Sequence, residues 1–322
     1  MSKLGVVFFG MEGLFSRAPL AALLAEERVR VNAIIVPRPT NKPAESDARF
    51  IAPHARLVTE IPIVQNVVEP NIIRMAWDAG IPVLEVASLS HPHTRAMIAN
   101  LQPDVICVAC FPKLLPRAIF QIAKRAALNL HPALLPAYRG PSPLFWIFHD
   151  GLEHAGVTLH LLDTRADRGA IVAQTRVALP DGISYSDAER ICAARGARLL
   201  LDAIRDGTFA HTPQSDGDFP RAPAPRDDDF IITPAWSARR AFNFIRGIAE
   251  WNREITFQAA GERWIVRDAL AFDEAETLNA PIKQIGAHWK IQCAPGTLTI
   301  QRAYQSPASP PPPSSRAQPC LV

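Results

Sequence analysis

The first two-thirds of the chain alternate short apolar runs with segments of helical periodicity. The apolar runs, which are typical of buried strands, are residues 4–10, 31–36, 81–87, 103–110, 128–131, 156–163 and 170–179. The segments with helical spacing of apolar residues are 16–27, 116–126, 142–151 and 184–204, the last with Ser184 as a plausible N-cap. Short strands that alternate with helices predict an α/β fold built on a largely parallel, doubly wound sheet.

The pattern changes after about residue 207. Residues 208–229 are rich in Pro and Asp with little apolar content, which is typical of a linker. A helix-like segment at 238–249 then leads into short alternating segments with Gly turns, which predict a small barrel or sandwich over 230–305. The Pro-rich stretch 306–322 is low in complexity and is predicted to be a disordered tail. We therefore expect a first domain over 1–207, a linker, a C-terminal domain and a tail.

Composition narrows the class of protein. The chain has 322 residues, of which 48% are hydrophobic, so it can form two buried cores. Its formal charge of +3 is too small to indicate nucleic-acid binding by itself. No apolar run approaches the ~20 residues of a membrane helix. The 5 cysteines are scattered, which argues against a disulfide scaffold and favours a reducing compartment. We expect a cytoplasmic globular protein with no membrane partner; its oligomeric state is left open.

One polar pair lies where an apolar strand ends. Asn129 and His131 are two positions apart in LNLHPALLPAYRG, so both side chains project from the same face of the strand. Pro132 ends that strand, and functional groups in parallel sheets gather at the carboxyl ends of strands. An Asn amide can stabilise an oxyanion, and a His can transfer a proton near neutral pH. The alternative is a hydrogen-bonded polar pair with no catalytic role.

A second polar loop, LLDTRADRGAIVAQ, adds carboxylates to this pair. Asp163 and Asp167 lie in a turn between two predicted strands, and Gly169 closes the turn. A carboxylate from this loop could orient His131 and favour its charged form. By itself the spacing is that of an ordinary polar loop, but together with Asn-x-His it indicates proton-transfer chemistry.

Three other patterns are weaker. Cys107 and Cys110 form a Cys-x-x-Cys pair, but residues three apart on a strand point to opposite faces and do not easily share a metal. His91 and His93 are followed by no acid or Cys at a useful spacing. The opening FFGMEG lacks the Gly-x-Gly-x-x-Gly fingerprint of dinucleotide-binding folds. We therefore expect neither a metal nor NAD.

The two polar blocks resemble a family signature. NLHPALLPAYRGPSP followed by GVTLHLLDTRADRG is similar to the signature of the 10-formyltetrahydrofolate-dependent formyltransferases. Over the whole chain, including the C-terminal domain, the resemblance is closest to the methionyl-tRNA formyltransferases. The resemblance extends to VVFFG, to CFPKLLP at 110–116, and to a C-terminal domain that begins near Phe230. It implies a Rossmann-like formyltransferase fold, a small OB-like barrel, 10-formyltetrahydrofolate as co-substrate, and a cytoplasmic enzyme of one-carbon metabolism and translation initiation.

The resemblance also implies roles for single residues. Asn129, His131 and Asp167 would form a catalytic trio. The Asn129 amide and a protonated His131 would stabilise the oxyanion formed when an amine attacks the formyl carbon. Asp167 would hold His131 charged or relay the proton of the amine. The residues implied on the folate side are Phe111, Lys113, Leu114, Leu115 and, in a structural role, Asp163.

Arg139 and Gly140 would either shape the loop over the amine substrate or only anchor a turn. The amine itself stays open. The C-terminal domain favours methionyl-tRNA, with initiator tRNA as partner. However, residues 37–60 carry acids among their bases where those enzymes have a Gly- and Lys-rich loop, and IAEWN at 248–252 replaces the usual Asn-Pro-Trp-Pro. The alternatives are an amino-sugar nucleotide, hydrolysis of formyl-folate, and a non-catalytic nucleotide- or RNA-binding module.

Overall fold

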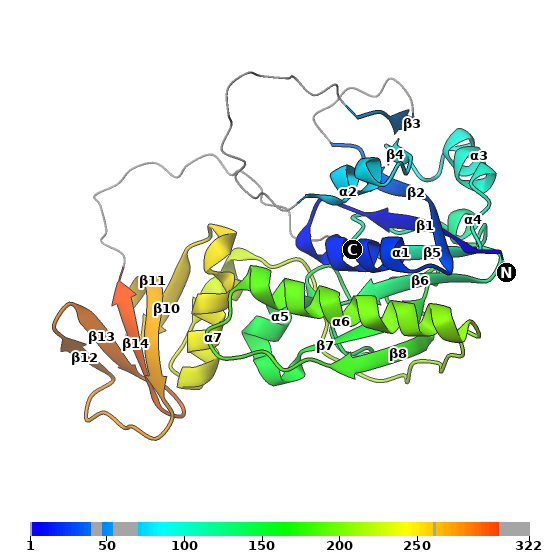
Figure 1. Cartoon of the computed structure of the whole chain (residues 1–322). Helices are drawn as coiled ribbons and strands as arrows, with labels where there is room; N and C mark the ends of the chain where they lie inside the picture. The colour runs from blue at the N-terminus through cyan, green and yellow to red at the C-terminus, as the bar shows by residue number, and fades with distance from the viewer. Residues whose placement is uncertain (1, 40–46, 54–69, 260–261, 303–322) are drawn as a thin grey trace, which may run out of the picture.

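The fold is built on two sheets with helices packed against them (Figure 1). The structure is a computed structural model, and it describes residues 2–39, 47–53, 70–259 and 262–302. The Pro-rich tail predicted for 306–322 lies outside the described residues, as does most of the segment 37–60. Among the described residues, no helix combines the length and the apolar character that crossing a bilayer requires.

The larger sheet has eight strands in the order β3-β4-β2-β1-β5-β6-β7-β8. Neighbouring strands run parallel from β4 to β6, whereas β3, β7 and β8 run antiparallel to their neighbours. The strands are β1 (Leu4–Gly10), β2 (Val29–Pro37), β3 (Ala48–Ile51), β4 (Val83–Val86), β5 (Val105–Ala109), β6 (Ala126–His131), β7 (Gly156–Leu161) and β8 (Ile171–Arg176). This confirms the predicted largely parallel α/β fold.

Helices cover both faces of this sheet. They are α1 (Leu14–Ala25), α2 (Ile72–Asp78), α3 (Pro92–Asn100), α4 (Arg117–Phe120), α5 (Pro143–Asp150) and α6 (Tyr185–Asp206), with a short 3₁₀ helix η1 (Leu152–His154). Helix α6 begins as predicted, because the Ser184 hydroxyl accepts a hydrogen bond from the Asp187 amide at 3.1 Å. Leu20 of α1 and Leu200 of α6 belong to one buried apolar cluster, and Ile98 of α3 and Ile119 of α4 belong to another.

The helix predicted over 116–126 is wrong in its second half. Helix α4 ends at Phe120, and β6 begins at Ala126. The Lys124 and Arg125 amides donate instead to the carbonyls of Pro103 and Asp104, just before β5. These bonds draw the chain into the sheet, so tertiary pairing overrides the local helical pattern.

The second sheet has six strands in the order β12-β13-β14-β11-β10-β9. Its elements are η2 (Asp227–Phe230), β9 (Ile231–Ile232), α7 (Ala238–Ile248), η3 (Ala249–Trp251), β10 (Ile255–Ala259), β11 (Glu262–Asp273), β12 (Ile282–Ile285), β13 (His288–Gln292) and β14 (Thr297–Arg302). Helix α7 packs on β11 and β14 and also against α5, which lies between the two sheets (Figure 1). At that crossing the Phe145 and Phe244 rings are 5.7 Å apart between centroids. The predicted C-terminal sheet domain is thus present.

Candidate active site

Four polar side chains share one face at the carboxyl end of β6. In the antiparallel pair β6–β7, Asn129 lies opposite His160 and His131 lies opposite Thr158. Residues directly opposite each other project from the same face of a sheet, so all four side chains lie together. All four are buried. Polar groups at this depth need hydrogen-bond partners, and the partners they have define the site.

A neutral histidine fixes the Asn129 amide. His160 donates from Nδ1 to the Leu161 carbonyl at 2.7 Å, so its Nε2 must act as an acceptor. That nitrogen lies 3.0 Å from Nδ2 of Asn129, which donates to it. Burial lowers the pKa of His160 to about 4, so the ring is neutral at pH 7. The amide orientation of Asn129 is therefore set by His160.

One ring nitrogen of His131 makes a hydrogen bond to the backbone, and the other faces Asp167. Its Nε2 donates to the Tyr138 carbonyl at 2.9 Å. Its Nδ1 is 3.6 Å from Oδ1 of Asp167 and has no hydrogen-bond partner. Oδ1 of Asn129 is likewise buried without a partner. Two unsatisfied buried atoms on neighbouring side chains mark a place where a ligand can bind.

Asp167 reaches His131 from the loop after β7 in an unusual backbone conformation. Its φ is +55°, which is rare for a residue other than Gly. Its Oδ2 accepts from the Gly140 amide at 2.9 Å. The loop closes tightly because Gly169 packs on the backbone of β7: a Cβ at this position would lie 1.6 Å from the Leu161 carbonyl oxygen.

The loop after β6 is tied to the sheet by Thr158. Its hydroxyl donates to the Ala133 carbonyl at 2.7 Å and accepts from the Leu135 amide at 3.1 Å. Gln174 on β8 also donates to that hydroxyl at 2.9 Å and to the Leu135 carbonyl at 2.7 Å. These bonds fix the path of the loop that leads from His131 to Tyr138.

Arg139 is held by a residue from the segment that the sequence indicates as a linker. Its guanidinium donates to Oε1 of Gln214, with Nε at 3.0 Å. The amide of Gln214 donates in turn to the carbonyls of Asp167 and Gly169. Nearby, Tyr138 and Arg139 exchange backbone bonds with Pro220 and Ala222. Part of the segment 208–229 therefore packs against the site.

The residues implied on the folate side divide by burial. Phe111 and Leu115 are buried in the apolar cluster that also contains Val108, the register partner of Asn129, so they lie on the Asn129 face of the sheet. Leu114 is 58% exposed. Lys113 donates to the Ala87 carbonyl.

Asp163 is exposed and lies apart from His131. Its carboxylate accepts from the amide and hydroxyl of the next residue, Thr164. These bonds make a local turn, which fits the structural role implied for it. The structure thus brings Asn129, His131 and Asp167 together and leaves Asp163 outside their contacts.

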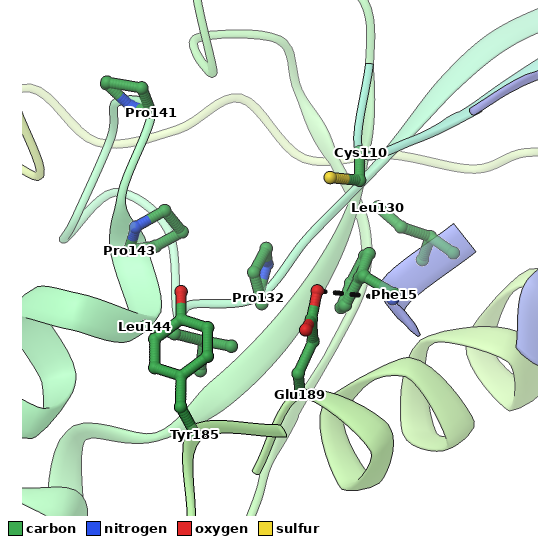
Figure 2. Close-up of a pocket in the computed structure, with 9 residues that line it drawn as sticks. All are labelled: Phe15, Cys110, Leu130, Pro132, Pro141, Pro143, Leu144, Tyr185 and Glu189. Atoms are coloured by element: carbon green, nitrogen blue, oxygen red, sulfur yellow. Dashed lines mark hydrogen bonds between the residues drawn. The ribbon is translucent and has the colours of Figure 1, made fainter. Parts of the chain in front are cut away.

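A small pocket lies on the other face of β6 (Figure 2). The residues that line it are Phe15, Cys110, Leu130, Pro132, Pro141, Pro143, Leu144, Tyr185 and Glu189. The Tyr185 hydroxyl and the Glu189 carboxyl point into it from α6 (Figure 2). Burial raises the pKa of Glu189 to about 7, and its Oε1 accepts from the Phe15 amide at 3.3 Å. Because Leu130 lies between Asn129 and His131 on the strand, the pocket is on the opposite side of β6 from the polar face.

Two residues of this site were not predicted from the sequence, His160 and Gln214. Antiparallel pairing of the strands 128–131 and 156–163 would have placed His160 opposite Asn129, so a signal existed. Gln214 gave none, because its partners are 45 to 75 residues away in the chain. Across the residues described here, no three His, Cys, Asp or Glu side chains are grouped so that they could hold a metal ion.

Comparison with solved structures shows likeness to formyltransferases of known fold. An N-formyltransferase from Helicobacter canadensis, in complex with folinic acid and dTDP-3-aminofucose, matches with a TM-score of 0.64 and 15% identity, over 94% of this chain and 100% of that one. A sugar N-formyltransferase from a Shewanella species matches with a TM-score of 0.53 and 15% identity, over 82% of this chain and 96% of that one. At such identity the likeness shows the fold alone.

HypX from Aquifex aeolicus, in complex with tetrahydrofolic acid, matches with a TM-score of 0.51 and 15% identity over 93% of this chain. The chain spans 44% of the length of that protein. Residues 6–204, which are more than half of the chain, match the formyl transferase family. That range holds most of β1, all of β2 to β8 and every residue of the polar face. The chain therefore belongs to the formyl transferase family.

Proposed function

We propose that this protein transfers the formyl group of 10-formyltetrahydrofolate to a primary amine, with Asn129, His131 and Asp167 as the catalytic trio. The observation that carries the proposal is the pair of buried, unpartnered atoms, Asn129 Oδ1 and His131 Nδ1, beside the Asp167 carboxylate. Membership of the formyl transferase family supports the reaction. Two of the similar structures hold a folate, which supports the co-substrate.

The reaction forms one C–N bond and breaks another. The amine attacks the formyl carbon, and the carbonyl oxygen becomes an oxyanion. One N–H of the Asn129 amide donates a hydrogen bond to His160, so the second N–H is available to donate to the oxyanion. The bond to N10 of the folate then breaks, and one proton passes from the amine to N10. Removing one oxyanion donor typically costs about 10²–10³ in rate.

His131 exchanges its proton at Nδ1. Its Nε2 is committed to the Tyr138 carbonyl, which can only accept. Protonation at Nδ1 makes the ring a cation that faces Oδ1 of Asp167 at 3.6 Å. The carboxylate stabilises that cation and keeps the nitrogen aimed at the reacting atoms.

Both substrates must meet at the carboxyl end of β6, beside Asn129 and His131. Phe111 and Leu115 provide an apolar wall on the Asn129 face, where the pterin ring binds, and the exposed Leu114 and Lys113 flank the rest of the folate.

Arg139 and Gly140 anchor the intervening loop rather than contact the amine. The Arg139 guanidinium is bound to Gln214, and the Gly140 amide is bound to Asp167. These bonds support the second of the two roles that the sequence left open.

An amino-sugar nucleotide is our first candidate for the acceptor. The N-formyltransferase from Helicobacter canadensis, which this chain matches over the full length of that protein, holds dTDP-3-aminofucose. Methionyl-tRNA is the second candidate. It is favoured by the C-terminal sheet domain that follows the catalytic fold, as in the methionyl-tRNA formyltransferases that the sequence resembles.

The test is release of tetrahydrofolate from 10-formyltetrahydrofolate, with amino-sugar nucleotides and charged initiator tRNA offered in parallel. We expect turnover with a sugar nucleotide and a loss of at least about 10²-fold in kcat on His131→Ala. His93→Ala on α3, which changes an exposed histidine, is the matched control. Turnover with tRNA and with no sugar nucleotide would show that the acceptor is methionyl-tRNA. Binding of nucleotide or RNA without turnover by any acceptor would favour the non-catalytic module.

A further inference from the structure

The side chain of Gln214 uses all its hydrogen-bonding capacity on the two loops that carry the proposed trio. Oε1 accepts from Nε of Arg139 at 3.0 Å and from the Nη2 of the same guanidinium. Nε2 donates to the Asp167 carbonyl at 2.8 Å and to the Gly169 carbonyl at 2.7 Å. One amide thus joins the loop after β6 to the loop after β7.

We propose that Gln214 is a positioning residue for Asp167. The inference rests on the proposed function, because it assigns Gln214 to the same site. Gln214 holds the backbone on both sides of residue 168, and this fixes where the Asp167 carboxylate lies relative to His131 Nδ1.

The backbone of Asp167 needs such a restraint. With φ at +55°, this residue occupies the left-handed region, which Asp adopts more readily than most residues but which still costs free energy relative to its common conformations, so contacts around it stabilise it there. The Gly140 amide holds the Asp167 side chain, and Gly169 packs on β7. The Gln214 amide is the contact that holds the Asp167 carbonyl itself.

The four hydrogen bonds of the Gln214 amide form a clamp between the two loops, and Arg139 fixes the orientation of the amide within it. A guanidinium only donates and the two carbonyls only accept, so the amide has one satisfactory orientation. Arg139 is itself 6% exposed, and its carbonyl accepts from the Ala222 amide at 2.9 Å. The buried arginine therefore orients Gln214, and Gln214 orients the Asp167 loop.

Two substitutions of Gln214 change its hydrogen bonds in different ways. Gln214→Glu keeps the size of the side chain and its contact with Arg139, but it sets an oxygen against the Asp167 and Gly169 carbonyls. Gln214→Met removes both halves of the clamp. Gln284→Met is the matched control, because Gln284 is an exposed residue of β12 in the second sheet.

The experiment measures kcat and KM for these variants in the wild-type and Asp167→Asn backgrounds. We expect both Gln214 variants to lower kcat by about 10- to 100-fold in the wild-type background, as misplacement of a catalytic group by about 1 Å does, with KM for the folate nearly unchanged. In the Asp167→Asn background the same changes should cost little more. An equal loss in both backgrounds, or none in either, would overturn the proposal.

A second measurement does not depend on activity. Amide hydrogen exchange over residues 163–169 should be at least about tenfold faster in Gln214→Met than in wild type and unchanged in Gln284→Met. Faster exchange in a protein that formylates no acceptor would support the clamp and refute the proposed function. Full turnover by the Gln214 variants together with unchanged exchange would refute the clamp and leave the function intact.

Discussion

The amide of Asn129 has its orientation set by an uncharged partner. His160 can accept from Asn129 only while its Nε2 carries no proton. Protonation would turn this acceptor into a donor and leave two donors facing each other, with Asp167 Oδ1 at 3.8 Å as the nearest carboxylate oxygen to Nε2. The oxyanion donor of the proposed reaction is therefore arranged by the low pKa of a second histidine.

This low pKa predicts a pH dependence of stability. The pKa of His160 is about 4 in the folded protein and about 6.5 in the unfolded chain, so the unfolded state binds more protons between these values. Stability from this group is complete above about pH 6.5 and is lost as the pH falls toward 4. Over that window the loss should approach about 3 kcal/mol.

Urea unfolding from pH 7.5 to 4.5 tests this against His160→Gln, which cannot titrate. Wild type should lose stability more steeply than the variant as the pH falls. Taking the difference between the two proteins removes the contribution of Glu189, whose raised pKa acts in the opposite direction. Parallel curves would contradict a neutral His160.

At the scale of elements, the turn from β7 to β8 depends on a missing side chain. A Cβ on Gly169 would lie 1.6 Å from the Leu161 carbonyl oxygen, which is backbone and cannot rotate away. Gly169→Ala should therefore displace the Asp167 loop and cost about 1–3 kcal/mol of stability, with loss of formyl transfer.

Gly196→Ala on α6 is the comparison. The atoms nearest to its Cβ would belong to the Leu130 and Val157 side chains, the closest at 3.3 Å. We expect a change within about 1 kcal/mol, measured by thermal unfolding, because helix propensity offsets the tighter contact. A Gly169→Ala variant as stable and active as Gly196→Ala would mean that the loop tolerates another path.

Residues whose partners lie nearby in the chain could be predicted from the sequence, and residues whose partners lie far away in the chain could not. Asn129 and His131 were visible because both lie on one strand with a period of two. The trio needed one more step, a carboxylate from the next loop. Gln214 could not be predicted from the sequence, because its role depends on contacts with two loops that are distant in the chain, and its own segment has the Pro- and Asp-rich composition of a linker. The second half of the helix predicted over 116–126 was wrong for the same reason, because hydrogen bonds to residues just before β5 draw this segment into the sheet.

At the scale of the whole molecule, the two sheets share one apolar core. Buried side chains of α5 and α7, including Phe148 and Phe244, belong to the same cluster as those beneath β6. A Cβ on Gly247 would lie 2.2 Å from the Phe148 ring, so the two helices cross in close contact. The sheets should therefore unfold together rather than one at a time.

Adjacent arginines on α7 test this coupling. Arg240 stacks 3.7 Å from the Trp236 ring centroid and donates to the His149 carbonyl at the end of α5. Arg239 is exposed and pairs with Asp181. Arg240→Met should lower the free energy of unfolding by about 1–3 kcal/mol, whereas Arg239→Met should change it by less than about 1 kcal/mol. Denaturation followed separately by tryptophan fluorescence and circular dichroism measures both; equal effects would argue against coupling through Arg240.

The pairing of β6 with β7 also limits how this chain can change in length. A shift of β7 by one residue against β6 would turn His160 and Thr158 to the opposite face. Asn129 would then lose its hydrogen-bond acceptor, and the loop after β6 would lose its bonds to Thr158. A shift by two residues would return both side chains to the face of Asn129, but neither would lie opposite its present partner on β6. Insertions and deletions compatible with formyl transfer should therefore be confined to the connections between strands, and the spacing from Thr158 to His160 should be invariant among active variants.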